Sequence, residues 1–251
     1  EGGFPVKISV AIITLNAAAE LDRCLASVAF ADEVVVLDQG SCDETAAVCV
    51  AHGAVLHQTE WLGFGPTKQK AAGMCRNPWV LSIDSDEEVT AELRRAIEEL
   101  PDEPDQAAFT VNRLSRFLGR WIRHCGWHPE YVTRLFDTRR ARFNDKPVHE
   151  SIETDGTVGR LEGLMLHYTY ENMEQYIDKL NRYTTLAAEE LHAAGRTTGL
   201  VSAVFRAKVA FWRMWLLKGG ILDGWAGTVL CLSSGFYVLS KYVKLWRMGR
   251  D

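Results

Sequence analysis

The stretch Val80–Val89, VLSIDSDEEV, is an apolar run that ends at two aspartates one residue apart. Residues i and i+2 of an extended chain point to the same side, so Asp84 and Asp86 are expected to face one point together. Two carboxylates that close repel each other unless a cation lies between them. Their oxygens suit Mg²⁺ or Mn²⁺ held together with diphosphate oxygens. The pair therefore predicts a divalent metal site. The plainer alternative is a polar turn before a helix over Glu87–Leu93, with the glutamates in its first turn.

Polar residues also follow two earlier apolar runs. Asn16 ends the run Val6–Leu15, and Asp38 follows Glu33–Leu37 just before a Gly-Ser turn. In an open α/β sheet, ligands bind beyond the carboxyl ends of the strands. Three successive strand ends with polar side chains therefore predict one crevice of nucleotide size. Asp43, after the turn, is explained equally well as a helix cap.

The elements that would position these residues alternate along the first hundred residues. In chain order we expect a strand at Val6–Leu15, a helix at Glu20–Val28, a strand at Glu33–Leu37, a helix at Asp43–Ala51, a strand at Ala54–His57, a helix at Lys68–Cys75, a strand at Trp79–Ile83 and a helix at Glu92–Leu100. After the PDEPDQ linker we expect strands at Ala108–Asn112, Val132–Phe136 and Met165–Tyr170 and a long helix at Asn172–Ala194. The alternation predicts an α/β fold with a mostly parallel central sheet flanked by helices.

The composition is that of an ordinary globular chain. Of 251 residues, 47% are hydrophobic and 24% are charged, so the core can be large enough to fold without disulfides. The six cysteines show neither a CxxC pair nor metal-finger spacing. With no secretory signal pattern at the start, they predict reduced thiols in a cytoplasmic protein.

The C-terminal segment differs from the rest in charge. Leu200–Asp251 has eight basic and two acidic residues, a net charge of +6, which leaves −11 on the rest of a chain whose total is −5. The acidic remainder argues against nucleic acid as a partner. Trp225–Ser240 is uncharged but shorter than the ~20 residues of a membrane span. We predict amphipathic helices lying on the inner leaflet; the alternative is a helical hairpin packed on the domain or on a second subunit.

Seven motifs spread over Ser9–Tyr183 carry a family resemblance: SVAIITLNAAAELDRCLASV, VVVLDQGSCDET, WLGFGPTKQKAA, WVLSIDSDEEVT, YVTRLF, NDKPVHE and LHYTYENMEQYIDKLNRY. Together they resemble family 2 glycosyltransferases of the GT-A type, most closely the bacterial β-1,4-glucosyltransferases that act on the lipopolysaccharide core heptose. The second motif often reads D-S-G-S-T-D in the family. Here Gln39 and Cys42 replace the Ser and Thr, while Asp38 and Asp43 keep their places.

The resemblance implies a GT-A type nucleotide-diphospho-sugar transferase fold with a C-terminal helical appendage. It implies a catalytic domain at 1–195, with a nucleotide-sugar half at 1–100 and an acceptor half at 101–195. Residues 196–251 would form a basic, apolar helical segment that associates with a membrane. The protein would be cytoplasmic and peripheral on the inner face of the cytoplasmic membrane, and an oligomer stays open.

The resemblance also implies donor-side roles. A UDP-sugar would lie against the first half of the sheet. Asp38 would bond the base, Asn16 would shape the nucleotide pocket, and Lys68 would lie toward the base or the phosphates. Asp84 would contact ribose or metal, and Asp86 would bind the Mg²⁺ or Mn²⁺ ion directly.

Other roles fall in the second half. By the resemblance, His167 would be a further metal ligand, and a histidine packed on a strand is the alternative. Arg134 could pair with diphosphate oxygens. Glu150 would be the base that removes the acceptor proton, with His149 orienting the acceptor or acting as the base instead.

Trp127 and His128 would form a wall on the acceptor side, although packing explains Trp127 equally well. The expected reaction is inverting, metal-dependent transfer of a hexose, glucose from UDP-glucose, onto a heptose of the lipopolysaccharide inner core. Transfer to a polyprenyl phosphate or another cell-envelope glycan is the alternative, and a non-catalytic nucleotide-binding module is a more distant one. Carboxylates two residues apart cannot straddle a sugar ring, which argues against a glycoside hydrolase.

Overall fold

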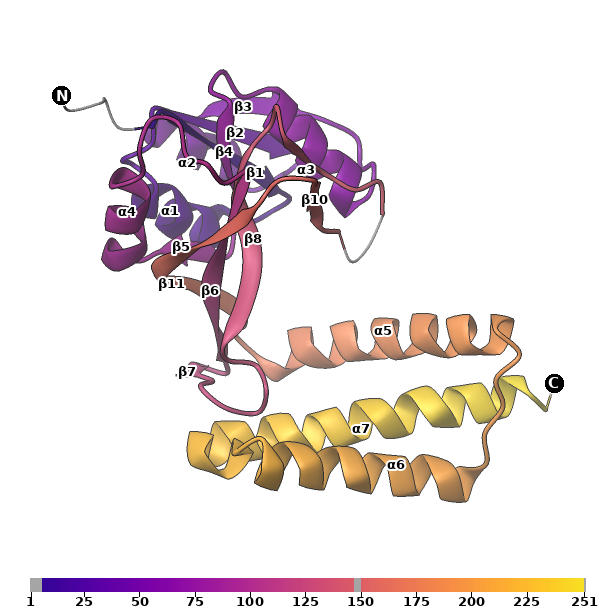
Figure 1. The fold of residues 1–251 in the computed structure, drawn as a ribbon. Coiled ribbons are helices and arrows are strands. Elements are labelled where there is room, and N and C mark those ends of the chain that lie inside the picture. The colour runs from indigo at the N-terminus through magenta and orange to yellow at the C-terminus, as the bar shows by residue number, and fades with distance from the viewer. Residues whose placement is uncertain (1–5, 147–149, 251) are drawn as a thin grey trace. The chain divides into compact units, whose positions relative to one another are not determined.

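The computed structural model describes residues 6–146 and 150–250 (Figure 1). Its contacts divide the chain into two compact units. We call Glu1–Arg113 with Glu130–His167 the sheet unit, and Leu114–Pro129 with Tyr168–Asp251 the helical unit. The functional division expected at residues 100 and 195 stays a prediction, since these units are defined by contacts alone.

The large sheet has nine strands within the described residues. Eight of them lie in the order β3 (Val55–Gln58), β2 (Glu33–Asp38), β1 (Ile8–Thr14), β4 (Trp79–Asp84), β8 (Glu130–Asp137), β6 (Ala108–Phe117), β11 (Val158–Tyr170) and β5 (Glu87–Val89), and β7 (Arg120–Trp121) pairs with β6. The first four are parallel, and β8 runs antiparallel to β4. β9 (Ala141–Phe143) and β10 (Ile152–Thr154) form a separate antiparallel pair.

Four helices cover the parallel part of the sheet: α1 (Ala18–Ser27), α2 (Thr45–Ala51), α3 (Phe64–Gly73) and α4 (Ala91–Glu98). Every residue of β1 is buried, as expected for a strand that is covered on both faces. Its alternate residues join two cores. Val10 and Ile12 belong to the cluster that includes residues of α1, α2 and α4, whereas Ala11 and Ile13 belong to the cluster that includes α3.

The register of the parallel strands brings their carboxyl ends level. Thr14 at the end of β1 is paired with Asp38 of β2, and Ile13 is paired with Asp84 of β4. Asn16 follows two residues after the end of β1. The three polar strand ends singled out in the sequence therefore lie along one edge of the sheet.

The chain after Asp84 differs from the expected helix. Glu87–Val89 is strand β5, which pairs antiparallel with Met165–His167 of β11. Helix α4 begins only at Ala91, where the Thr90 hydroxyl accepts a hydrogen bond from the N–H of Leu93 at 3.4 Å. The interpretation of Glu87 as a first-turn helix acid is therefore wrong, because its side chain is fully buried.

Three long helices dominate the helical unit: α5 (Met173–Ala193), α6 (Leu200–Trp212) and α7 (Gly224–Met248). A π-helical turn at Arg213–Leu217 and a 3₁₀ turn at Gly220–Asp223 connect α6 to α7. α7 packs against both α5 and α6. Its Gly235 lies where a Cβ would come within 3.3 Å of the Ala207 carbonyl oxygen, so a small residue lets α6 and α7 approach closely.

One helical stretch in the described residues, Gly220–Met248, is long and apolar enough to cross a membrane. Its mean hydropathy reaches 1.2, and 28% of the most apolar window is buried against the rest of the chain. Since α7 packs on two other helices, length and composition alone do not distinguish a span from a packed helix.

We expect Gly163→Ala to be strongly destabilising. Gly163 has φ +92°, and a Cβ there would overlap the backbone nitrogen of Leu93 in α4. The left-handed backbone costs about 1–2 kcal/mol for alanine, and overlap with backbone atoms adds to it. We expect a loss of about 3 kcal/mol or more in the free energy of unfolding, measured by urea denaturation.

Gly53→Ala is the matched control. Gly53 has φ +68° but no atom within 4 Å of its Cβ position, so only the backbone cost applies, about 1–2 kcal/mol. Equal losses in both variants would contradict the close packing of β11 on α4.

Candidate active site

Lys68 joins two carboxylates at the edge of the sheet. Its Nζ lies 2.8 Å from Asp84 Oδ1, at the end of β4, and 2.8 Å from Glu150 Oε1. The lysine comes from α3, and its side chain is only 3% exposed. Asp84 and Glu150 are 28% and 20% exposed, so both stay accessible from solution. The structure thus brings together three residues that the sequence singled out separately.

Arg134 of β8 holds the other oxygen of Asp84. Its Nη2 lies 2.8 Å from Asp84 Oδ2 and 2.5 Å from Glu87 Oε1. Arg113 of β6 donates to Glu87 as well, at 3.2 Å, and to Glu130 at 3.0 Å. Glu87 also accepts the backbone N–H of Asp84 at 3.0 Å. A buried network of charges therefore fixes the end of β4.

These neighbours decide the protonation of the network. Burial alone would raise the pKa of Asp84, but the charges of Lys68 and Arg134 outweigh it and hold that pKa well below its usual range. Burial would lower the pKa of Arg134, and the charges of Glu87 and Asp84 raise it instead. Asp84 and Arg134 are therefore both ionised at neutral pH.

Asp86 contacts a different partner from Asp84. Its Oδ2 lies 3.4 Å from His167 Nε2, on β11. The argument that Asp84 and Asp86 point the same way along an extended strand does not apply, because Ser85 and Asp86 form the turn between β4 and β5. Asp86 and His167 are 35% and 14% exposed at their side chains. Their contacting oxygen and nitrogen atoms lie close enough together to be ligands of one ion.

The residues present fit a divalent cation that also binds a diphosphate. Among the described residues no group of three or more His, Cys, Asp or Glu side chains converges on one point. Mg²⁺ sites often use only one or two carboxylates and take their remaining ligands from water and substrate phosphates. Four acidic side chains contact three permanent cations in this network (Asp84, Glu87, Glu130 and Glu150; Lys68, Arg113 and Arg134), and Asp86 lies in the adjoining turn, against His167. The excess negative charge favours a bound cation.

Asn16 and Asp38 organise the loops after β1 and β2. Asn16 has φ +48°; its N–H donates to Ser41 Oγ at 2.8 Å, and its Oδ1 accepts the N–H of Cys42 at 2.8 Å. Asp38, 2% exposed, accepts the Ser41 hydroxyl at 2.6 Å. These bonds tie the loop after β1 to the loop after β2.

Asp43 joins the starts of α1 and α2. It accepts the N–H of Thr45 at 3.1 Å and the N–H of Ala18, the first residue of α1, at 3.1 Å. Hydrogen bonds, above all that of the Thr45 hydroxyl, lower the pKa of Asp43. The N-cap residue of α2 is Glu44, so Asp43 is not the N-cap that the alternative describes, although it bonds the first residue of each helix.

Three other predicted site residues are not among those that the sheet unit brings together here. His149 lies outside the described residues. Trp127 and His128 belong to the helical unit. There Trp127 packs edge-on against Phe117 at 6.2 Å between ring centroids, next to the core of that unit.

Glu87 and Arg113 are members of the site that the sequence reasoning missed. Glu87 was assigned to a helix start, and Arg113 lies in a stretch with no motif. One signal was available. A strand that directly follows the two aspartates would direct alternate glutamates to opposite faces, and only one of them could face solvent.

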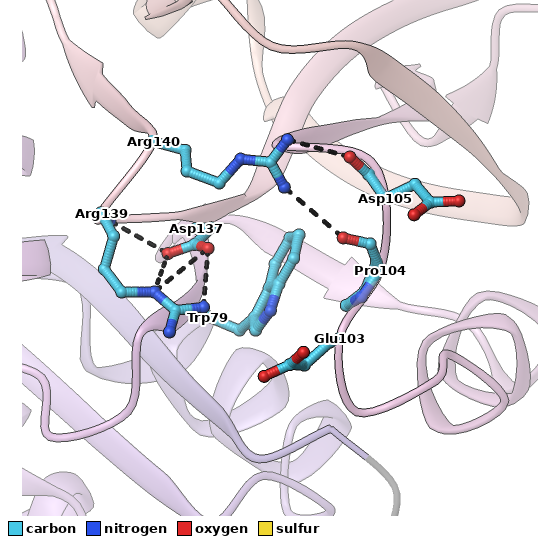
Figure 2. A pocket seen from close by; sticks show the side chains of 7 residues that line it. All are labelled: Trp79, Glu103, Pro104, Asp105, Asp137, Arg139 and Arg140. Carbon is cyan, nitrogen blue, oxygen red and sulfur yellow. Dashed lines mark hydrogen bonds and ion pairs between the residues drawn. The ribbon is translucent and has the colours of Figure 1, made fainter.

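A cavity of about 410 Å³ opens at the other end of β4 (Figure 2). It is lined by Trp79, Glu103, Pro104, Asp105, Asp137, Arg139 and Arg140. Arg139 is engaged by Asp137 at 2.8 Å, and Arg140 donates to backbone carbonyl oxygens. Trp79 and Asp84 are the first and last residues of β4, about 17 Å apart for an extended strand. This cavity is therefore separate from the candidate site.

Comparisons with known proteins give a family match. The family model described as Glycosyl transferase family 2 matches residues 9–162. The chain is 29% identical over 253 residues to the lipopolysaccharide core biosynthesis glycosyltransferase LpsC of Rhizobium meliloti (strain 1021), covering 96% of this chain and 92% of that protein. It is 30% identical over 266 residues to an uncharacterized glycosyltransferase of Rickettsia typhi, covering 98% and 89%.

A solved structure shows the same fold. S. aureus TarS 1-349 in complex with UDP-GlcNAc matches with a TM-score of 0.52 and 16% identity, over 96% of this chain and 90% of that one. Together with the family match, this confirms the expected fold class, a GT-A type α/β fold.

We expect Glu87→Gln to destabilise the protein. The change leaves the buried Arg134 guanidinium without one of its two carboxylates, and breaking a buried pair in this way costs about 3–5 kcal/mol. The measurement is the free energy of unfolding at neutral pH. Glu98→Gln removes an exposed pair with Arg94 on α4 and should cost under about 0.5 kcal/mol. Similar losses in the two variants would contradict a structural role for the buried network.

Proposed function

Since the chain belongs to glycosyl transferase family 2, we propose that it is an inverting, metal-dependent hexosyltransferase that moves glucose from UDP-glucose onto a heptose of a lipopolysaccharide inner core. One observation carries the proposal. Lys68 bridges Asp84, at the end of a central strand, and Glu150, so the donor-side carboxylate and the candidate base share one cation.

The acceptor class rests on the relatives. LpsC, which aligns over 96% of this chain, is named as a glycosyltransferase of lipopolysaccharide core biosynthesis. The acceptor would be a lipid-anchored oligosaccharide. Its synthesis from a cytoplasmic UDP-sugar suits an enzyme that is peripheral on the inner face of the cytoplasmic membrane. The +6 charge of residues 200–251 supports attachment to an anionic surface.

The donor would lie along the edge formed by β1, β2 and β4. Asp38 would bond the base, and Asn16 would hold the loop against which the nucleoside rests. Both are positioned by the Ser41–Cys42 turn, so they are preorganised before the donor arrives. The Lys68 ammonium group would also contact the diphosphate. Asp84 would contact the ribose or the metal.

The diphosphate side would use the turn after β4. Asp86 and His167 would hold Mg²⁺ or Mn²⁺ together with phosphate oxygens. When bound, the ion would offset the charge that develops on the departing UDP. Arg134 is buried and already paired with Asp84 and Glu87, so its role would be to hold Asp84 in place rather than to meet the phosphates freely.

Glu150 would act as the base. As the acceptor hydroxyl oxygen forms its bond to the anomeric carbon, its proton passes to the Glu150 carboxylate, and the bond from that carbon to the UDP oxygen breaks on the opposite face. The configuration inverts. The contact with Lys68 would orient the Glu150 carboxylate. Trp127 and His128 would line the acceptor, and His149 would help to orient it.

The proposed acceptor is tested by a transfer assay. The purified full chain is given radiolabelled UDP-glucose with Mn²⁺ and either a heptose-terminated core lipid or a polyprenyl phosphate. We expect label on the core lipid. Label on the polyprenyl phosphate alone would replace the proposed acceptor while leaving the donor assignment intact.

We expect Glu150→Gln to lower kcat by about 10²–10⁴-fold, because general-base catalysis contributes that much. UDP binding should change little, since glutamine keeps the shape of the side chain. Glu153→Gln, an exposed change on β10, is the control and should leave kcat unchanged. A Glu150→Gln enzyme with normal kcat would assign the base elsewhere.

We expect Asp86→Asn to weaken metal-dependent UDP binding by about 100-fold or more, measured by calorimetry with Mn²⁺. Binding in chelator should be equally weak for both proteins. Glu88→Gln, two residues along on β5, is the control and should retain the wild-type affinity. Tight UDP binding that ignores chelator would contradict the metal site.

A further inference from the structure

Helix α6 has an apolar stripe on its outward face. Val201, Phe205 and Trp212 are 86%, 67% and 51% exposed. With Val209, they recur at steps of three or four residues along α6, and exposed Leu216 follows four residues after Trp212 in the π-helical turn. At 100° per residue the four residues of α6 fall within an arc of about 80°. So much contiguous exposed apolar surface on one helix marks an interaction site rather than scattered surface residues.

The opposite face of α6 makes the contact with α7. Ala203 and Met214 are buried, and Ala207 faces Gly235 of α7. Phe211 and Trp215 stack with 5.9 Å between ring centroids beside the core of the helical unit. The stripe is therefore not the face that completes this core.

Basic side chains flank the stripe on both sides. On a helical projection Lys208 lies at one edge, and Arg206 and Arg213 lie at the other. All three are exposed. The sequence has no Asp or Glu from Leu200 to Leu222. An apolar strip between two basic edges matches the interface of an anionic bilayer, where the apolar residues enter the acyl boundary and the cations meet phosphate groups.

We propose that the outward stripe of α6 docks on the surface of an anionic phospholipid bilayer. The proposal refines the proposed membrane location by naming the docking face. It needs none of the proposed catalytic roles, so it can fail while they stand. Trp212 would lie at the level of the headgroups, where tryptophan is enriched in membrane proteins.

The basic end of α7 is less suited to this role than the sequence suggested. Lys244 Nζ donates to both oxygens of Asn181 and to the hydroxyls of Thr184 and Thr185, all within 2.7–2.9 Å. Lys241 lies 5.0 Å from the centroid of the Tyr242 ring. Arg206 of α6 is engaged in the same way, at 4.9 Å from the centroid of the Tyr242 ring and 3.2 Å from Ser202 Oγ. Lys208 and Arg213, both exposed, are therefore the cations beside the strip that are better placed to meet lipid phosphates.

A second copy of the chain is a poorer occupant than a bilayer. Two α6 faces brought together would place like-charged edges, each with Arg206, Lys208 and Arg213, close to one another. Like charges so placed oppose association. Lipid phosphates would neutralise the same groups.

The test is vesicle flotation of the full chain. Vesicles of phosphatidylglycerol and phosphatidylcholine should bind the protein, vesicles of phosphatidylcholine alone should bind it far less, and high salt should weaken the binding. We expect the double change Phe205→Ser with Trp212→Ser to lower the partition coefficient about tenfold or more. Changing Arg206, Lys208 and Arg213 to Gln should remove the preference for anionic vesicles.

Ile177→Ser with Leu186→Ser is the matched control. These residues are 49% and 47% exposed on α5, and the double change should leave vesicle binding unaltered. Donor binding by every variant, measured by calorimetry, verifies that the sheet unit is intact. Equal binding by the α6 and α5 variants would overturn the proposal. So would resistance of the bound protein to carbonate extraction, or a change in oligomeric state in the α6 variant without any loss of vesicle binding.

Discussion

The candidate site depends on the pairing of carboxylates with buried cations at the end of β4. Asp84 accepts from Lys68 on one oxygen and from Arg134 on the other, and the same Nη2 atom of Arg134 also donates to Glu87. An unpaired buried charge costs several kcal/mol, so each member of this set requires the others. The paired charges thus hold these side chains in place before any donor binds. Such preorganisation is what group-transfer chemistry needs.

The same pairing shapes the fold around the site. Arg134 reaches Asp84 because β8 runs antiparallel beside β4, and Arg113 reaches Glu87 from β6, the strand next to β8. β5 is only three residues long, yet its pairing with β11 brings the backbone of Glu87 level with His167. The short strand therefore links the charged network to the Asp86–His167 pair. The arginines of the network thus come from β8 and β6, which join the sheet beside β4.

Local patterns predicted much of this arrangement. Buried parallel strands are recognised in the sequence as runs of β-branched residues, so their ends could be predicted. The ends of parallel strands lie at the same edge of the sheet, which is where Asn16, Asp38 and Asp84 are found. The direction of Asp86 could not be predicted in this way, because a tight turn replaces the extended chain after Asp84. The helix position expected for Glu87 is wrong for a related reason. A charged residue in a three-residue strand has the same local sequence pattern as one in the first turn of a helix.

Contacts between distant segments set the limit of sequence reasoning. Lys68 and Glu150 are 82 positions apart, and nothing in either motif states that they meet. The helical unit shows the same limit in its charges. The composition of the C-terminal segment gives no reason to distinguish one cation from another as a partner for lipid phosphates. In the structure, however, Lys244 contacts four oxygen atoms of α5. Because a cation engaged by its own chain has little left for a lipid phosphate, the docking face that we propose lies on α6 rather than at the basic end of α7.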